Sequence, residues 1–108
     1  MIYTISDLRN VIAPIAKKYQ IPAIYLFGSY ARGIATESSD IDLLVDTTGT
    51  DLTSLLSLGA LHCELADTLQ KSINLITVSS LQQKAQMPSE QDFRETVLHE
   101  MIKLCGVA

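Results

Sequence analysis

The spacing of hydrophobic positions changes several times along this chain, and each change predicts a different element. Between residues 8 and 19, apolar residues recur every three or four positions, which is typical of one face of a helix. Ser6 is the expected N-cap of this helix, and Pro14 is expected to kink or split it. Two mainly apolar runs then predict buried strands over residues 23–27 and 40–45, although the second contains two aspartates.

The second half of the chain predicts further helices and a third strand. A broad leucine-rich face predicts a buried helix that begins near Asp51. Residues 73–78 are expected to form a strand, followed by a short helix over residues 79–85. A last helix is expected to begin at Ser89, with one face formed by Phe93, Val97, Met101 and Leu104. This order of elements predicts an α+β (α/β/α) fold, in which helices flank a small mixed sheet of at least three strands.

Composition and charge narrow the class of protein. A chain of 108 residues has the size of one domain, residues 1–108, and its 47% hydrophobic content supports one compact core. The net charge of −4 provides no broad basic surface, so duplex nucleic acid is not an expected partner. No apolar run reaches the roughly 20 residues that span a bilayer, and no signal-like pattern begins the chain, so a cytoplasmic location is expected. Cys63 and Cys105 form no CxxC pair and are expected to be buried small side chains.

The residues around Gly28 and Ser29 predict an anion-binding corner. Gly28 ends the first strand, and the next few residues suit one or two helical turns that stop at Gly33. Glycine lets a ligand approach the backbone, the N–H groups of a first helical turn attract anions, and the serine hydroxyl adds a donor. Arg32 lies about one turn further on. It either contacts the same anion or is an ordinary solvated arginine.

Asp40 and Asp42 predict a metal site at the start of the second strand, with ten residues between Ser29 and Asp40. Residues i and i+2 of a strand share a face, so the two carboxylates lie roughly 6–7 Å apart along the backbone. Like charges in this arrangement repel unless a cation lies between them. Mg²⁺ prefers such oxygen ligands and binds one or two carboxylates together with substrate phosphates. Two such ions roughly 3.5–4 Å apart suit phosphoryl transfer.

Together, the segments 26–33 and 38–45 resemble the catalytic signature of the minimal nucleotidyltransferase family, in the DNA polymerase beta-like superfamily. The resemblance implies a polymerase beta-like nucleotidyltransferase fold and Mg²⁺-dependent transfer of a nucleoside monophosphate from an NTP, with ATP expected. It implies that Gly28 and Ser29 bind the nucleotide phosphates and that Asp40 and Asp42 bind metal. It also implies a HEPN-domain partner, because some members are antitoxins that AMPylate a tyrosine of such a protein.

Asn74 marks a departure from this family. The superfamily usually supplies a third carboxylate from a later strand, and Asn74 stands at the matching position. An asparagine can offer a carbonyl oxygen to a metal, but it cannot act as a base, so turnover is expected to be slow or absent. Asp46 and Glu64 are alternative acids, although Asp46 is expected at the wrong end of its strand. If the strand register differs by one residue, Asn74 is an ordinary polar residue.

The sequence also suggests roles for two histidines and one tyrosine. His62 and His99 have no ligand partner at metal spacing, so surface or packing roles are expected. Tyr30 either contacts a nucleotide base or packs in the core, and the sequence leaves both alternatives open.

Two hypotheses of function follow. The leading one is a nucleotidyltransferase that moves AMP from ATP to a hydroxyl, with a tyrosine of a HEPN-type partner in a toxin–antitoxin system as the expected acceptor. The rival is a catalytically weak or inactive antitoxin that binds nucleotide and acts by protein contact, and a nucleotide-sensing regulatory subunit is a variant of it. A homo-oligomer is compatible with the sequence.

Overall fold

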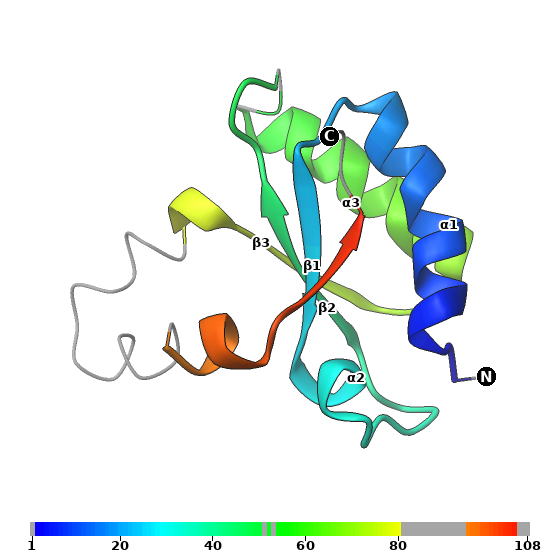
Figure 1. The fold of residues 1–108 in the computed structure, drawn as a ribbon. Coiled ribbons are helices and arrows are strands. Elements are labelled where there is room, and N and C mark those ends of the chain that lie inside the picture. The colour runs from blue at the N-terminus through cyan, green and yellow to red at the C-terminus, as the bar shows by residue number, and fades with distance from the viewer. Residues whose placement is uncertain (1, 51, 53, 81–94, 106–108) are drawn as a thin grey trace.

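A four-stranded mixed sheet forms the centre of the molecule in a computed structural model that describes residues 2–50, 52, 54–80 and 95–105 (Figure 1). The strands β1 (Ala23–Phe27), β2 (Ile41–Asp46), β3 (Ile73–Thr77) and β4 (Ile102–Cys105) are arranged in the order β3-β2-β1-β4. β1 is antiparallel to both β2 and β4, and β3 is parallel to β2. The expected small mixed sheet flanked by helices is therefore confirmed, with β4 as a fourth strand.

The first helix, α1 (Ile5–Lys18), has Thr4 as its N-cap. Thr4 Oγ1 accepts from the Asp7 N–H at 3.0 Å, and the Asp7 carboxylate accepts from the Thr4 N–H at 3.1 Å. This reciprocal capping box satisfies two N–H groups, so the prediction of Ser6 as N-cap was wrong. The helix also runs unbroken through Pro14, which lies on its exposed side, where water can reach the carbonyl left without a donor.

The long helix α3 (Leu55–Leu69) begins later than predicted, at the N-cap Ser54. Ser54 and Ser57 form a capping box, whereas Asp51 lies outside the described residues. The helix buries Leu61, Leu65 and Leu69, which recur every four residues, while Leu56 is 86% exposed. The leucines of α3 therefore extend around more of the helix than the face that packs into the core.

The two faces of the sheet are covered unequally. Side chains that alternate along β1 and β2 pack with α1 and α3 into the larger core, and α1 and α3 lie together in Figure 1. On the opposite face, a smaller cluster joins Phe27 and Leu44 to Val97, which comes from the helical residues 95–100. Because strand residues alternate between faces, this second face is also the one to which Asp42 and Asn74 belong.

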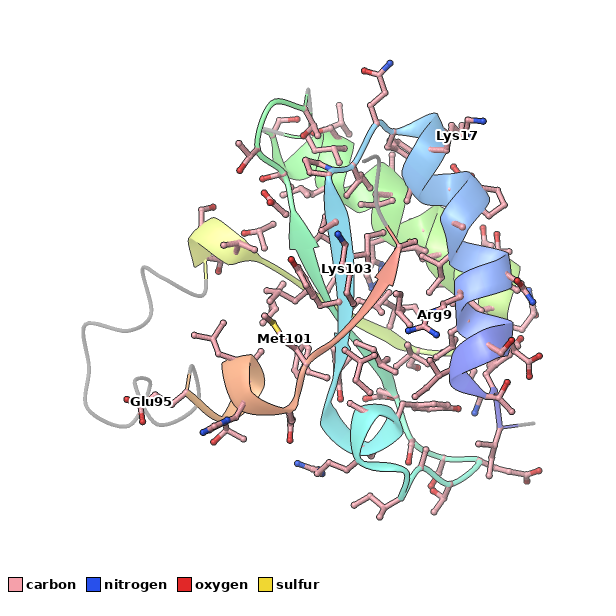
Figure 2. All side chains as sticks on the ribbon, in the orientation of Figure 1. Arg9, Lys17, Glu95, Met101 and Lys103 are labelled. Carbon is pink, nitrogen blue, oxygen red and sulfur yellow. The ribbon has the colours of Figure 1, made fainter. Side chains whose placement is uncertain are left out.

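The C-terminal part of the chain corrects one prediction. Helical residues 95–100 are followed by β4, so the helix expected to continue through Leu104 was wrong beyond residue 100. Ile102 and Leu104 alternate with Lys103, and pairing with β1 satisfies a strand edge that would otherwise be open. Arg9 Nη2 also donates to the Lys103 carbonyl at 3.2 Å, which ties α1 to β4 (Figure 2). Residues 78–80 are helical, and the remainder of the short helix predicted over 79–85 lies outside the described residues, as do Ser89 and Phe93.

The cysteines differ from expectation as well. Cys63 is exposed on α3, and Cys105 is half-buried in β4, so the prediction of two buried thiols was wrong for Cys63. The physical reason is that α3 buries only one stripe of its surface, and Cys63 lies outside the stripe formed by Leu61, Leu65 and Leu69. Among the helices in the described ranges, none has the length and apolar character needed to cross a membrane.

Candidate active site

A glycine corner joins β1 to the short helix α2 (Gly28–Arg32). Gly28 has a φ of +74°, and Gly33 ends the helix with a φ of +75°, so both occupy the left-handed region that favours glycine. A Cβ atom added to Gly28 would overlap Asp42 Oδ2 and lie 3.0 Å from Asp42 Cγ. Gly28 is therefore required by its backbone conformation and by the close approach of the Asp42 carboxylate.

The two aspartates converge on the side chain of Asn74. Asp42 and Asn74 are directly paired across β2 and β3, and Asn74 Nδ2 donates to Asp42 Oδ1 at 2.8 Å. The same nitrogen lies 3.4 Å from Oδ2 of Asp40, which is the residue directly before β2. The pairing excludes the alternative in which a one-residue shift removes Asn74 from the aspartates. The amide nitrogen, rather than the carbonyl oxygen, faces both carboxylates.

Asp42 is the electrostatically perturbed member of this group. Burial raises the pKa of the Asp42 carboxyl above its ordinary value, and the negative charges of Asp40 and Glu100 act in the same direction. The hydrogen bond from Asn74 and the positive charge of Arg32 oppose this rise in pKa without cancelling it. A carboxylate whose charge is poorly compensated is a suitable neighbour for a cation.

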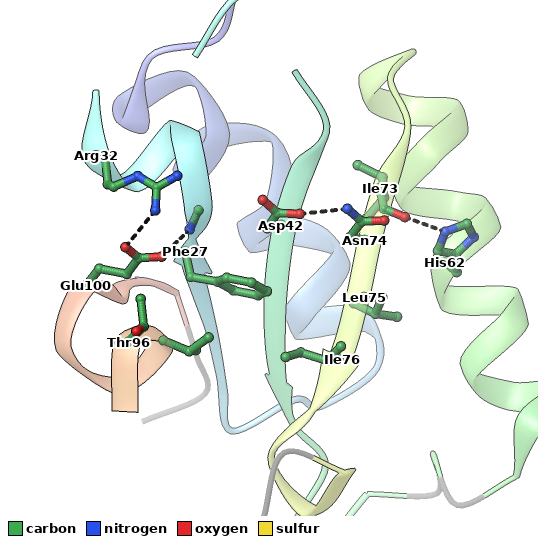
Figure 3. Close-up of a pocket in the computed structure, with 12 residues that line it drawn as sticks. Phe27, Arg32, Asp42, His62, Ile73, Asn74, Leu75, Ile76, Thr96 and Glu100 are labelled. Carbon is green, nitrogen blue, oxygen red and sulfur yellow. Dashed lines mark hydrogen bonds and ion pairs between the residues drawn. The ribbon is translucent and has the colours of Figure 1, made fainter. Parts of the chain in front are cut away.

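Glu100 is a site residue that the sequence did not reveal. Its Oε1 accepts from the Gly28 N–H at 2.9 Å, and its Oε2 accepts from Arg32 Nη1 at 3.2 Å (Figure 3). The Glu100 side chain is 17% exposed, whereas that of Arg32 is 50% exposed. Glu100 lies 72 positions from Gly28 along the chain, and a single polar residue near a helix end carries no local signal of such a contact.

A cavity of about 600 Å³ connects these groups (Figure 3). Its volume is in the range of small-molecule sites, and its wall combines polar side chains with apolar ones. The lining residues are Phe27, Gly28, Arg32, Asp42, His62, Ile73, Asn74, Leu75, Ile76, Thr96, Val97 and Glu100. Of the six residues predicted to form the site, Gly28, Arg32, Asp42 and Asn74 line this cavity, whereas Ser29 and Asp40 are not among its lining residues, and Asp40 lines a separate pocket.

The alternative acids lie elsewhere. Asp46 ends β2 at the far end from Asp42, where it accepts from the Thr48 N–H at 2.9 Å. Glu64 Oε1 pairs with Lys18 Nζ at 3.0 Å and accepts from the Tyr19 hydroxyl at 2.9 Å. These contacts hold both carboxylates away from Asn74, so neither replaces the third acid in this arrangement.

The structure places Tyr30 and His62 in packing contacts and leaves His99 on the surface. Tyr30 is 5% exposed and belongs to the larger core, and its hydroxyl has no hydrogen-bond partner among the described residues. His62 Nε2 hydrogen-bonds the carbonyl of Ile73 at 2.8 Å, so this histidine joins α3 to β3 at one wall of the cavity. His99 is exposed. Within the described ranges, no group of three or more His, Cys, Asp or Glu side chains is arranged to hold a metal.

Comparison with known proteins identifies the family. Residues 10–100 match the family model described as "Polymerase beta, Nucleotidyltransferase". "Putative protein adenylyltransferase MJ0126" from Methanocaldococcus jannaschii is 38% identical over 82 residues, which cover 72% of this chain and 82% of that protein. Protein adenylyltransferase MntA from Thermococcus cleftensis is 29% identical over 103 residues, which cover 92% of this chain and 94% of that protein.

The fold agrees with these relationships. A crystal structure of a toxin–antitoxin with AMP-PNP matches with a TM-score of 0.68 at 25% identity, over 92% of this chain and 73% of that one. The range that matches the family model contains the glycine corner, both aspartates and Asn74. The resemblance seen in the two sequence segments is thereby confirmed, and the chain belongs to the polymerase beta nucleotidyltransferase family.

Proposed function

We propose that this protein transfers AMP from ATP to a hydroxyl group of a protein partner. The observation that carries the proposal is the convergence of Asp40 and Asp42 on one point beside the Gly28 corner, at a cavity of about 600 Å³. Relatives that are named protein adenylyltransferases support AMP as the transferred group and a protein as the acceptor.

The glycine corner would bind the phosphates of the nucleotide. The Gly28 N–H and the Arg32 guanidinium are hydrogen-bond donors at the cavity, and in this structure both donate to Glu100. Ser29 adds a hydroxyl at the first turn of α2. These are donors that suit phosphate oxygens.

The donor set fits Mg²⁺. Asp40 and Asp42 each lie within hydrogen-bond distance of the same Asn74 nitrogen, so a cation near that position would contact two carboxylate oxygens. A half-turn of the Asn74 amide would present its oxygen as a third, neutral ligand. These donors suit one ion, and the second ion expected from the family would depend on oxygens of the nucleotide. When bound, Mg²⁺ would neutralise the negative charge that builds up on the phosphates of the leaving group.

The chain's own residues would set the rate. The acceptor oxygen forms a bond to the α-phosphorus, the α–β phosphoanhydride bond breaks, and pyrophosphate leaves with the bonding electrons. The hydroxyl proton must pass to a base, and the neutral amide of Asn74 cannot accept it. A positioned base contributes about 10²–10⁴-fold. Asp42 and Glu100 are the carboxylates among the described residues that line the cavity. Asp42, whose pKa burial raises, is the one paired with Asn74 across the strands, so it is the candidate base, and slow turnover is expected.

Label transfer tests this function. The protein is incubated with ATP labelled at the α-phosphate, Mg²⁺ or Mn²⁺, and candidate acceptors that include HEPN-domain proteins. Asp42→Ala should abolish transfer, whereas Asp46→Ala, at the opposite end of β2, should leave it intact. No transfer with any acceptor, or equal transfer by wild type and Asp42→Ala, contradicts the catalytic proposal.

A second candidate is an antitoxin that neutralises a HEPN-type partner by contact and retains only nucleotide binding. The observation that favours it is the Asn74 amide, which donates to both aspartates in place of a third acid. The similarity to a chain of a toxin–antitoxin structure supports a protein partner for either candidate. Neutralisation of the partner by Asp42→Ala to the same extent as by wild type would favour contact over transfer.

A further inference from the structure

The carboxylate of Glu100 uses the same donors that the proposed function assigns to the nucleotide. Each of its oxygens has its own partner, since Oε1 accepts from the Gly28 N–H and Oε2 accepts from Arg32 Nη1. Figure 3 shows Glu100 approaching Arg32 and the start of α2 from the helical residues 95–100. A carboxylate with two such contacts resembles the way in which a phosphate oxygen pair would be held.

We propose that Glu100 is a built-in competitor of the nucleotide: its carboxylate occupies the phosphate position, and a nucleotide binds by displacing it. The inference rests on the proposed function, because it takes Gly28 and Arg32 to be phosphate-binding residues. It adds that the affinity of this protein for nucleotide is set by an exchange between two anions, and that Glu100 keeps the affinity low.

Charge balance explains why both anions cannot share the site. Among the described residues that line the cavity, Arg32 is the one arginine or lysine, whereas Asp42 and Glu100 are both carboxylates. Glu100 already contributes to the raised pKa of Asp42 as a like charge. Mg²⁺ at the aspartates would offset part of the phosphate charge, but it would not free the Gly28 N–H and Arg32, which Glu100 occupies, so a phosphate at these two donors would lie against the Glu100 carboxylate.

The backbone beside Glu100 is held, so the displacement is a movement of the side chain. Val97 is 1% exposed and packs with Phe27 and Leu44, and the Met101 N–H donates to the Val97 carbonyl at 2.9 Å. β4 begins at Ile102, directly after this turn. Rotation of the Glu100 side chain would move the carboxylate into water without disturbing the sheet.

Glu100→Gln is the informative variant because it keeps the shape of the side chain. A glutamine can still accept from the Gly28 N–H, but it carries no charge to hold Arg32. Loss of a hydrogen bond between charged groups corresponds to about a tenfold change in an equilibrium constant. The dissociation constant for ATP should therefore fall by about tenfold.

Glu95→Gln is the matched control. Glu95 lies in the same helical stretch, is exposed, and does not line the cavity (Figure 2). This variant removes the same charge from the protein without touching Gly28 or Arg32. Glu100→Asp is a second variant, which keeps the charge but shortens the side chain by one methylene, so it cannot bridge both donors in the same way.

Calorimetric titration with a non-hydrolysable ATP analogue, with tripolyphosphate and with adenosine tests the inference, with Mg²⁺ present and folding checked by thermal unfolding. We expect Glu100→Gln to bind the analogue and tripolyphosphate about tenfold more tightly than wild type. Glu100→Asp should lie between the two, and Glu95→Gln should match wild type. Adenosine binding should be the same for all four proteins, because adenosine has no phosphate to compete with the carboxylate.

Three outcomes overturn the inference. If wild type binds the analogue and Glu100→Gln binds it equally or more weakly, Glu100 is a structural clamp, and the proposed function stands. If Glu95→Gln tightens binding as much as Glu100→Gln, net charge is the cause. If none of the folded proteins binds the analogue or tripolyphosphate, the proposed function fails together with the inference.

Discussion

Replacing Gly28 by alanine tests the central geometric claim about the site. Two separate features oppose a side chain at this position: the backbone φ of +74° and the Asp42 carboxylate that a Cβ would overlap. Gly33→Ala is an unusually well-matched control. Gly33 has a φ of +75°, but a Cβ added there would meet nothing within 4 Å.

The two features have different magnitudes. An L-residue in the left-handed region costs about 1–2 kcal/mol, and this cost applies to both variants. At Gly28 the carboxylate of Asp42 must also move, and such overpacking costs about a further 1–3 kcal/mol. Gly28→Ala should thus reduce the free energy of unfolding by about 2–5 kcal/mol, against about 1–2 kcal/mol for Gly33→Ala.

Chemical denaturation with urea measures both variants, and the difference between them isolates the contact with Asp42. Because 1 kcal/mol shifts the midpoint by roughly 4–8 °C in a domain of this size, thermal melting also resolves the difference. Displacement of Asp42 should in addition abolish Mg²⁺-dependent binding of ATP in Gly28→Ala alone. Equal destabilisation by the two variants would refute the close approach of Gly28 and Asp42.

Three further predictions address the acids and the first helix. Asn74→Asp should raise AMP transfer by about 10²–10⁴-fold by adding a proton acceptor, and unchanged rates in the label-transfer assay would count against a role for this position. Asp42 has a raised pKa, so its ionised form destabilises the folded state. Without metal, the free energy of unfolding should therefore increase as the pH falls through that pKa. Asp42→Asn should remove this pH dependence and raise the free energy of unfolding at neutral pH by about 0.2–1 kcal/mol, a small value because the group is partly exposed. Urea denaturation from about pH 4 to about pH 7 measures both effects. Thr4→Ala should cost about 1 kcal/mol in thermal unfolding, whereas Ser6→Ala should cost less than about 0.5 kcal/mol, and the reverse order would place the cap at Ser6.

The segment from β1 to β2 was predictable because its signals are local. β1 spans the predicted residues 23–27, and α2 stops at Gly33 as expected. Apolar runs of strand length and glycines with positive φ act within a few residues of the chain, so sequence spacing alone reports them. Asp42 lies on the face of β2 that the alternation predicts, whereas Asp40 precedes the strand, so the predicted start of this strand at Asp40 was wrong by one residue.

The boundaries of α1 and α3 were less predictable, because neighbouring polar residues compete as caps. Thr4 and Ser6 both have hydroxyls, and the structure selects Thr4, whose partner Asp7 lies three residues on. Ser54 likewise begins α3 in preference to the earlier aspartate. In both helices the residue selected as N-cap is the one that forms a reciprocal capping box with the residue three positions on.

The sequence by itself determined which groups the candidate site contains: a glycine corner, two aspartates two residues apart and an amide where a third acid is expected. Tertiary structure alone decided which charged side chain contacts the glycine corner and Arg32. β4 forms because β1 offers an unpaired edge, and Glu100 reaches the Gly28 N–H and Arg32 because β4 places the preceding turn beside them. Contacts between residues 72 positions apart depend on the folded arrangement of the whole sheet, and no local pattern records them.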